Sequence, residues 1–166
     1  MYEYFPKEPK KKELLILFGL LGGGFFLFGI SKNPSLPFPA ILQLLSVVLF
    51  CGVVVVLTRY LLRDFSYSIE PRDNIGVPDL IVREFCGKRI SVVCRISLDD
   101  IIEVRSVSAK EARDLVKQRK GRCIYNYTCH ITPARLYLLT VRDGETLYDL
   151  RIVADEGLIS HLCINK

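Results

Sequence analysis

The sequence predicts a membrane-anchored α+β protein, in which a transmembrane helical hairpin precedes an antiparallel β domain that ends in one helix. Residues 14–30 and 40–58 are apolar and uncharged. At a rise of ~1.5 Å per residue they form helices about 26 and 28 Å long, close to the ~30 Å of a bilayer core. From residue 63 onward, period-two alternation typical of strands replaces these runs. We therefore expect a basic cytoplasmic arm, a transmembrane hairpin and a cytoplasmic β domain, at residues 1–13, 14–62 and 63–166.

The first apolar run could also be a cleaved signal peptide, because lysines precede it. However, the run is long for a signal core, and residues 31–34 offer no A-x-A cleavage site. A second span follows almost at once, so a retained hairpin is the preferred interpretation.

Basic residues precede the first span and close the second. They are Lys7, Lys10, Lys11, Lys12, Arg59 and Arg63. The connecting loop, residues 31–39, contains only Lys32 and is stiffened by prolines. The positive-inside rule therefore predicts a two-span membrane protein with both termini in the cytoplasm. The basic arm also suits anionic membrane lipid on that side.

Within the spans, small residues are the main feature. Gly19, Gly23 and Gly52 give smooth surfaces on which helix backbones approach closely, and they predict packing of the two spans on each other. A dimer contact through the same glycines stays open. Gln43 is the one strongly polar residue in the spans, so a subunit of a small oligomeric channel or transporter is a weaker alternative.

Three strands are expected at the start of the β domain, at residues 65–70, 79–85 and 89–96. The last two are joined by a turn around Gly87. Alternation in the third strand places Ile90, Val92, Cys94 and Ile96 on its buried face.

Further strands are expected at residues 122–131, 136–142 and 146–153, with Asp143-Gly144 as a strong hairpin signal. In the last strand the pattern directs Asp149 and Arg151 outward. The chain then changes period, and residues 155–163 predict a helix capped by Asp155. Antiparallel strands with one closing helix predict a small barrel or sandwich.

A helical insert, residues 108–120, interrupts the strands. Ser108 and Glu111 have the spacing of a capping box. Basic residues at its end are candidate contacts for anionic lipid or an acidic partner. They are Lys117, Arg119, Lys120 and Arg122. The alternative is a solvated helix end, where cations favourably meet the helix dipole.

Composition and motifs favour a non-enzymatic protein without cofactor or metal. The net charge of +5 comes mostly from the N-terminal lysines, which argues against a nucleic-acid partner. The six cysteines include no C-x-x-C pair, so a zinc site is not predicted, and cytoplasmic thiols are expected to stay reduced. His130 and His161 are the only histidines, and His130 is expected at the surface or an edge. A Cys–His pair remains the enzymatic alternative.

The order of elements resembles bacterial pleckstrin-homology-like (PH-like) membrane proteins with two N-terminal transmembrane helices. The resemblance rests on the two spans, on the closing helix and on residues 96–104, where Leu98, Asp99 and Ile101 match the family's leucine–acid–isoleucine step. It implies a PH-like β-barrel or sandwich and a binding or assembly module that engages a protein partner or a second copy, as a homo-oligomer. It does not imply phosphoinositide binding, because residues 71–78 carry one arginine against one acid.

Overall fold

The structure, a computed structural model, describes residues 2–6, 9–33, 38–71, 76–119, 121–133 and 135–164, with the backbone alone at 109, 113, 116, 117 and 164. It divides into two compact units. The helical unit is Pro9–Arg63, and the β unit combines Met1–Glu8 with Asp64–Lys166. The loop prolines at 34 and 37, and residues 72–75 of the connection 71–78, lie outside the described residues.

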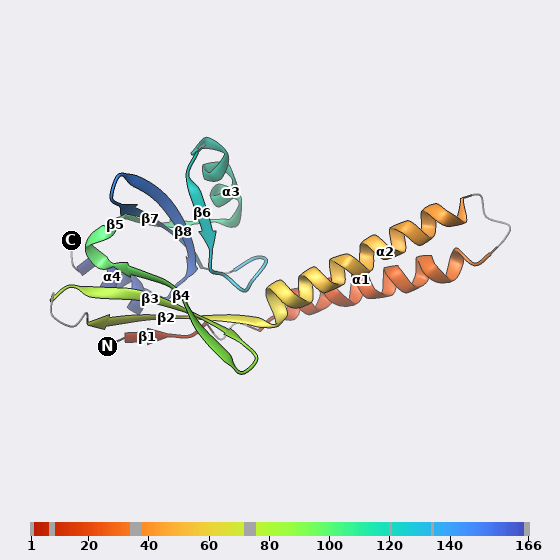
Figure 1. Ribbon diagram of the computed structural model, residues 1–166, viewed down its shortest axis with the longest axis horizontal. Helices are drawn as coiled ribbons and strands as arrows, with labels where there is room; N and C mark the ends of the chain where they lie inside the picture. The colour runs from red at the N-terminus through yellow and green to blue at the C-terminus, as the bar shows by residue number, and fades with distance from the viewer. Residues whose placement is uncertain are drawn as a thin grey trace. The chain divides into compact units, whose positions relative to one another are not determined.

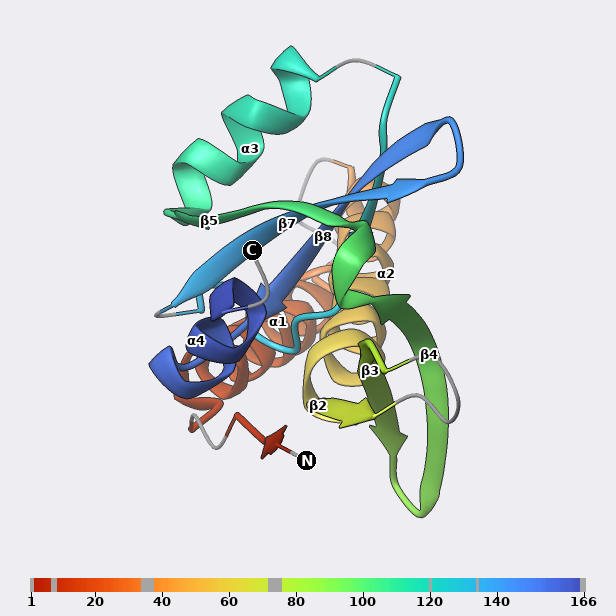
Figure 2. The same cartoon turned by 90° about the vertical axis from the view of Figure 1, so that its left-hand side faces the viewer.

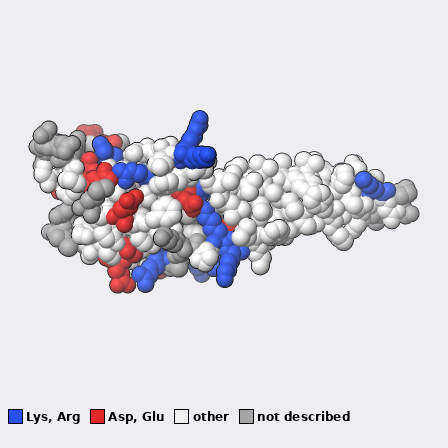
Figure 3. All heavy atoms as spheres, turned by 90° about the horizontal axis from the view of Figure 1, so that it is seen from below, with Lys and Arg blue, Asp and Glu red and all other residues white. Residues whose placement is uncertain are grey.

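The helical unit is the expected hairpin. It contains α1 (Lys11–Ile30) and α2 (Pro39–Val56), which continues as the π-helical turn η1 (Leu57–Leu61) (Figure 1). Both helices are long and apolar enough to cross a membrane, by length and composition. On the face seen in Figure 3, the hairpin surface is free of charged residues along most of its length. Lys10 Nζ donates to the carbonyls of Leu61, at the end of η1, and of Arg63, just beyond it, at 3.1 and 2.9 Å.

The two helices pack through small residues. A Cβ at Gly23 or Gly52 would touch a leucine of the other helix at 3.5 or 3.4 Å. Gly24 is more crowded, since a Cβ there would lie 3.0 Å from the Phe50 ring, and its carbonyl accepts a 3.0 Å bond from Ser46 Oγ. A Cβ at Gly19 would meet nothing within 4 Å. The structure therefore places Gly23 and Gly52 at the helix contact and Gly19 away from it.

The β unit contains two four-stranded sheets. The first has the order β1 (Tyr2–Tyr4), β2 (Arg63–Pro71), β3 (Pro78–Cys86), β4 (Arg89–Ser97). The 3₁₀ turn η2 (Leu98–Asp100) leads into the second sheet, with the order β5 (Ile101–Val107), β7 (Leu136–Asp143), β8 (Thr146–Val153), β6 (Cys123–Asn126). The helices are α3 (Ala109–Gln118) and α4 (Glu156–Ile164). The first residues of the basic arm thus form an edge strand.

Side chains from both sheets and from α4 form one core. Tyr67 and Leu80 from the first sheet, Leu139 and Leu150 from the second, and Leu158 from α4 are at most 1 % exposed. Asp155 caps α4, as expected, by accepting from the Leu158 N–H at 2.8 Å. Because α4 contacts β1 and β5, it closes the side of the core between these two strands.

The α+β class is confirmed, but the two sheets do not join into a closed barrel. Strand β6 pairs in parallel with β8, whereas the pairs β1–β2, β3–β4, β5–β7 and β7–β8 are antiparallel. Helix α3 lies on the face of the second sheet opposite α4, as Figure 2 shows. Its capping box between Ser108 and Glu111 is present as expected.

The expected alternation of β4 is wrong in the first half of the strand. Ile90 and Val92 are 63 % and 56 % exposed, whereas Ile96 is buried. Val82 pairs with Cys94 and Arg83 pairs with Val92, so β4 carries one extra residue, Val93. Such a bulge inverts the alternation, so that the side chains before it and those after it follow opposite patterns. Ile90 and Val92 therefore leave the core face.

Two other expectations are corrected in the second sheet. The strand expected at residues 122–131 is formed only at Cys123–Asn126, and the rest of that range is irregular. Asp149, expected to face solvent, is 1 % exposed. It does point away from the core, but the end of α3 covers that face. The hairpin at Asp143-Gly144 is confirmed with its turn shifted by one residue, because Asp143 pairs with Thr146.

Candidate functional site

The side of the β unit opposite α4 is open and forms a cleft. Here the outer strands β4 and β6 face each other, while α4 covers the side with β1 and β5. Between them lies a cavity of about 500 Å³. Its lining consists of Val93, Cys94, Gly121, Cys123, Tyr125, Tyr127, Asp143, Thr146, Leu147 and Tyr148.

Three tyrosines form the wall of this cleft. The rings of Tyr125 and Tyr127 are stacked with centroids 6.4 Å apart, and Tyr148 meets Tyr125 edge-on at 5.7 Å. Backbone bonds fix Tyr127, since its N–H donates to the Arg151 carbonyl at 3.0 Å and its own carbonyl accepts from Tyr67 Oη at 2.6 Å. Because Tyr67 belongs to the first sheet, the wall is held by both sheets.

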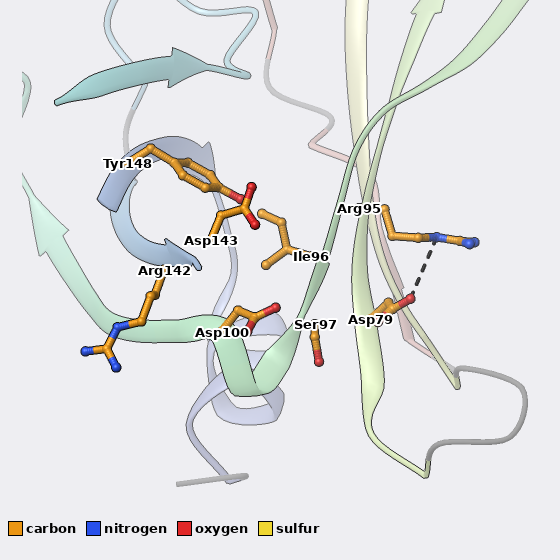
Figure 4. Close-up of a pocket in the computed structure, with 8 residues that line it drawn as sticks. All are labelled: Asp79, Arg95, Ile96, Ser97, Asp100, Arg142, Asp143 and Tyr148. Carbon is orange, nitrogen blue, oxygen red and sulfur yellow. Dashed lines mark ion pairs between the residues drawn. The ribbon is translucent and has the colours of Figure 1, made fainter. Parts of the chain in front are cut away.

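A second, polar cavity of about 250 Å³ adjoins the first one, and Asp143 and Tyr148 line both cavities. Figure 4 shows Asp100 and Asp143 pointing into the space, while the guanidinium groups of Arg95 and Arg142 point away from it. Asp79 is 3 % exposed; its Oδ2 lies 3.8 Å from Arg95 Nε, and its Oδ1 has no hydrogen-bond partner among the described residues. This end of the cleft is therefore suited to a cationic group.

Burial favours the neutral form of three groups in the cleft, the Cys94 thiol and the Tyr127 and Tyr148 hydroxyls. Burial raises the pKa of Cys94, and burial also raises the pKa values of Tyr127 and Tyr148. A thiol with a raised pKa is a weak nucleophile, because the thiolate is the reactive form. The described lining contains no histidine that could activate it. The Cys–His enzyme alternative therefore gains no support from this site.

Of the basic residues singled out in the sequence, Arg119 and Arg122 make their contacts on the other face of the second sheet. Arg119 Nη1 donates to Asp149 Oδ1 at 2.9 Å and to Thr140 Oγ1 at 3.0 Å, and Nη2 lies 3.3 Å from Glu103 Oε2. Arg122 Nη1 is 4.0 Å from the same Asp149 oxygen. The Lys117 side chain and all of Lys120 lie outside the described residues. The lipid or partner contact stays a prediction, with Arg119 already engaged by the sheet.

Asp149 is the residue that sequence reasoning missed. The signal was present in its cross-strand partner, Thr140, and in the outer positions Leu136 and Leu138, which are too apolar for a solvent-facing side. An apolar outer face predicts a cover, and a carboxylate under that cover needs a cation.

The two histidines lie on different segments of the β unit. His130 is 5 % exposed, so the expectation that it lies at the surface is wrong; the segment that carries it packs inward instead of continuing β6. His161 lies on α4 with its ring centroid 5.0 Å from that of Tyr2. In the described part of the chain, no group of three His, Cys, Asp or Glu residues could hold a metal ion.

No protein-family model, curated protein or solved structure matches this chain.

Proposed function

We propose that the protein is a non-enzymatic, membrane-anchored binding module, whose cleft between β4 and β6 binds an extended, basic segment of a protein partner or of a second copy. The observation that carries this proposal is the open side of the β unit, where two outer strands and a tyrosine wall border one cavity. The two sheets and the closing helix support a PH-like relationship, and the parallel strand β6 departs from it.

Anchoring is supported by the surface of the helical unit. In the most apolar 18-residue stretch of each helix, only 11 % of the residues are buried. Most of these side chains therefore need an apolar environment from outside the protein. The connectivity adds a second argument. Strands β1 and β2 pair with each other, and the hairpin is inserted between them. Two spans inserted between paired strands return the chain to the side on which they began, and the basic flanks favour the cytoplasm.

Binding of an extended segment is supported by the strand edges. β4 and β6 are the outer strands of their sheets, so each presents a row of main-chain groups that no described strand pairs. An added strand can use these groups for affinity and the neighbouring cavity for selectivity. The bulge at Val93 lies where the β4 edge borders the cavity.

The preference for a basic residue follows from the lining. Tyrosine ring faces attract a cation, and nearby carboxylates strengthen that attraction when the group is partly desolvated. Tyr125 and Tyr148 supply the rings, and Asp143 lies in both cavities. A lysine or arginine side chain seated on the tyrosines would direct its charge toward Asp143 and Asp100.

The test is photo-crosslinking of the full chain in its native membrane. A benzoylphenylalanine at Tyr125, which is 47 % exposed, should give a specific adduct. The same group at Ile102, 38 % exposed on β5, should not. Asp143→Asn in the Tyr125 background should weaken the adduct if the bound segment is basic. An adduct at Ile102 with none at Tyr125 would place the binding surface elsewhere and overturn the proposal.

Deletion of the helical insert, residues 108–120, would be a less specific test of partner binding than these point variants. That deletion would remove Arg119 and leave the buried carboxylate of Asp149 without its main partner. A lost adduct would then report damage to the sheet rather than a lost interface.

A further inference from the structure

The outer face of the first sheet carries an apolar group of side chains outside the cleft. This hairpin patch consists of Phe5, Phe85, Ile90 and Val92. Phe5, Ile90 and Val92 are 40 %, 63 % and 56 % exposed. Phe85 pairs directly with Ile90 across the β3–β4 ladder, and its ring meets that of Phe5 edge-on at 5.5 Å. The patch is thus one continuous surface built from two segments far apart in the sequence.

The patch lies on the face that points away from the core. Arg83, which precedes Phe85 by two residues, bonds to Ser68 and Glu70 at 2.6 Å on that face. The bulge at Val93 transfers Ile90 and Val92 to the same side. The sequence therefore places four large apolar groups where water would contact them.

The position of the patch along the strands indicates what covers it. Figure 1 shows β2 and β3 running in opposite directions, so the turn that joins β3 to β4 lies at the end of the sheet where β2 begins. β1 pairs antiparallel with β2 through Tyr4 and Tyr67, so β1 ends there as well. Both chain connections to the hairpin of α1 and α2 therefore leave from the patch end of the sheet. Only Leu62 separates η1 from β2.

Two cationic residues lie at the tip of the hairpin formed by β3 and β4. The turn consists of Gly87, at φ +61°, and Lys88, and Arg89 follows at once. Lys88 and Arg89 are both exposed. Exposed apolar and aromatic side chains beside Lys and Arg are typical of protein surfaces that lie in the headgroup region of a bilayer.

We propose that the hairpin patch is a membrane-contact surface, which sits in the interfacial layer of the bilayer that holds α1 and α2. Phe5, Phe85, Ile90 and Val92 contact the boundary between headgroups and acyl chains, about 5–10 Å into the lipid. Lys88 and Arg89 meet anionic headgroups. This inference rests on the proposed anchoring. Together with the two helices, the contact would fix the orientation of the β unit, and hence of its cleft, on the membrane surface.

The chain contains no tryptophan, so one introduced tryptophan reports its own depth. We would reconstitute the full-length variants Ile90→Trp, Val48→Trp and Ile102→Trp in vesicles of phosphatidylcholine and phosphatidylglycerol. Brominated acyl chains would quench tryptophans in the lipid, and aqueous iodide would quench those in water. Val48 lies on α2 and is 56 % exposed, which makes it the positive control for spanning. Ile102, on the second sheet, is the control outside the patch.

We expect the Ile90→Trp variant to lose most of its emission to a shallow bromolipid and the Val48→Trp variant to a deep one. The Ile102→Trp variant should respond only to iodide. Ile90→Trp combined with Lys88→Ser and Arg89→Ser should show weaker bromolipid quenching in vesicles that contain anionic lipid, because the cations no longer hold the patch against the headgroups.

Three outcomes would count against the reasoning, and they can be told apart. If Val48→Trp is quenched by bromolipid and Ile90→Trp behaves like Ile102→Trp, the anchoring stands and the membrane-contact inference fails. If bromolipid and iodide both spare Ile90→Trp, a protein covers the patch, and the inference fails too. A Val48→Trp variant that no bromolipid quenches would overturn the anchoring itself.

Discussion

Removal of Arg119 should destabilise the β unit more than removal of any exposed arginine. Its guanidinium bonds to Asp149 Oδ1 at 2.9 Å, and Asp149 is 1 % exposed. The other carboxylate oxygen, Oδ2, has no hydrogen-bond partner among the described residues. Arg119→Ala therefore leaves a buried charge with Thr140 as its remaining close donor.

The expected cost follows from this geometry. Loss of one partner of a buried ion pair costs about 3–5 kcal/mol. The Arg119 side chain is 21 % exposed, and Arg122 at 4.0 Å supplies part of the lost field, so we expect about 3 kcal/mol. With a urea dependence of about 1–3 kcal/mol per molar, the unfolding midpoint should fall by about 1–3 M.

Tyrosine fluorescence of the full chain in micelles provides the assay, since all of the eight tyrosines except Tyr60 belong to the β unit. Arg135→Ala is the matched control, because Arg135 contacts Glu156 at 3.3 Å with both side chains exposed, and it should cost at most about 1 kcal/mol. Arg119→Ala with Asp149→Asn should recover part of the loss, since no buried charge remains. Equal midpoints for Arg119→Ala and Arg135→Ala would refute the view that the pair stabilises the sheet.

Three further outcomes are expected. Tyr2→Phe removes the 2.7 Å bond to Asp155 and should cost about 1 kcal/mol in the same assay. That bond raises the pKa of Tyr2 from 10.0 to about 12, so its contribution should persist below pH 10 and disappear as the pH rises through about 12; a flat pH dependence would contradict it. Gly24→Leu should separate the two helices and cost about 1–3 kcal/mol by steric-trap unfolding in lipid, whereas Gly19→Leu should be neutral. Cys94 should be alkylated more slowly than the exposed cysteines at pH 7.5, by mass spectrometry of the intact protein, because burial raises its pKa; equal rates would rule this out.

Local sequence pattern was sufficient to predict a helix or strand wherever a residue's environment is set by its near neighbours in the chain. The two apolar helices, the capped helix α3, the closing helix and most strands follow from hydrophobic period, capping residues and turn glycines. Each of these signals acts over a few residues, so it survives without knowledge of the rest of the fold.

The candidate sites depended on contacts between distant segments. The cleft exists because α4 covers one pair of outer strands and leaves the other pair open, and no local pattern states which pair. Strand alternation predicts that Asp149 faces solvent, and only the fold shows that Arg119, thirty positions earlier, covers it.

The elements, the apolar hairpin and the alternation along most strands could therefore be predicted from the sequence, because these depend on the side-chain period of one segment. The tertiary structure alone decided which faces are covered. One unpaired residue, Val93, moves Ile90 and Val92 from the core to the outer face, because a strand's alternation is inverted by a single bulge. Burial is a property of pairs of segments, and a pattern read along one segment does not contain it.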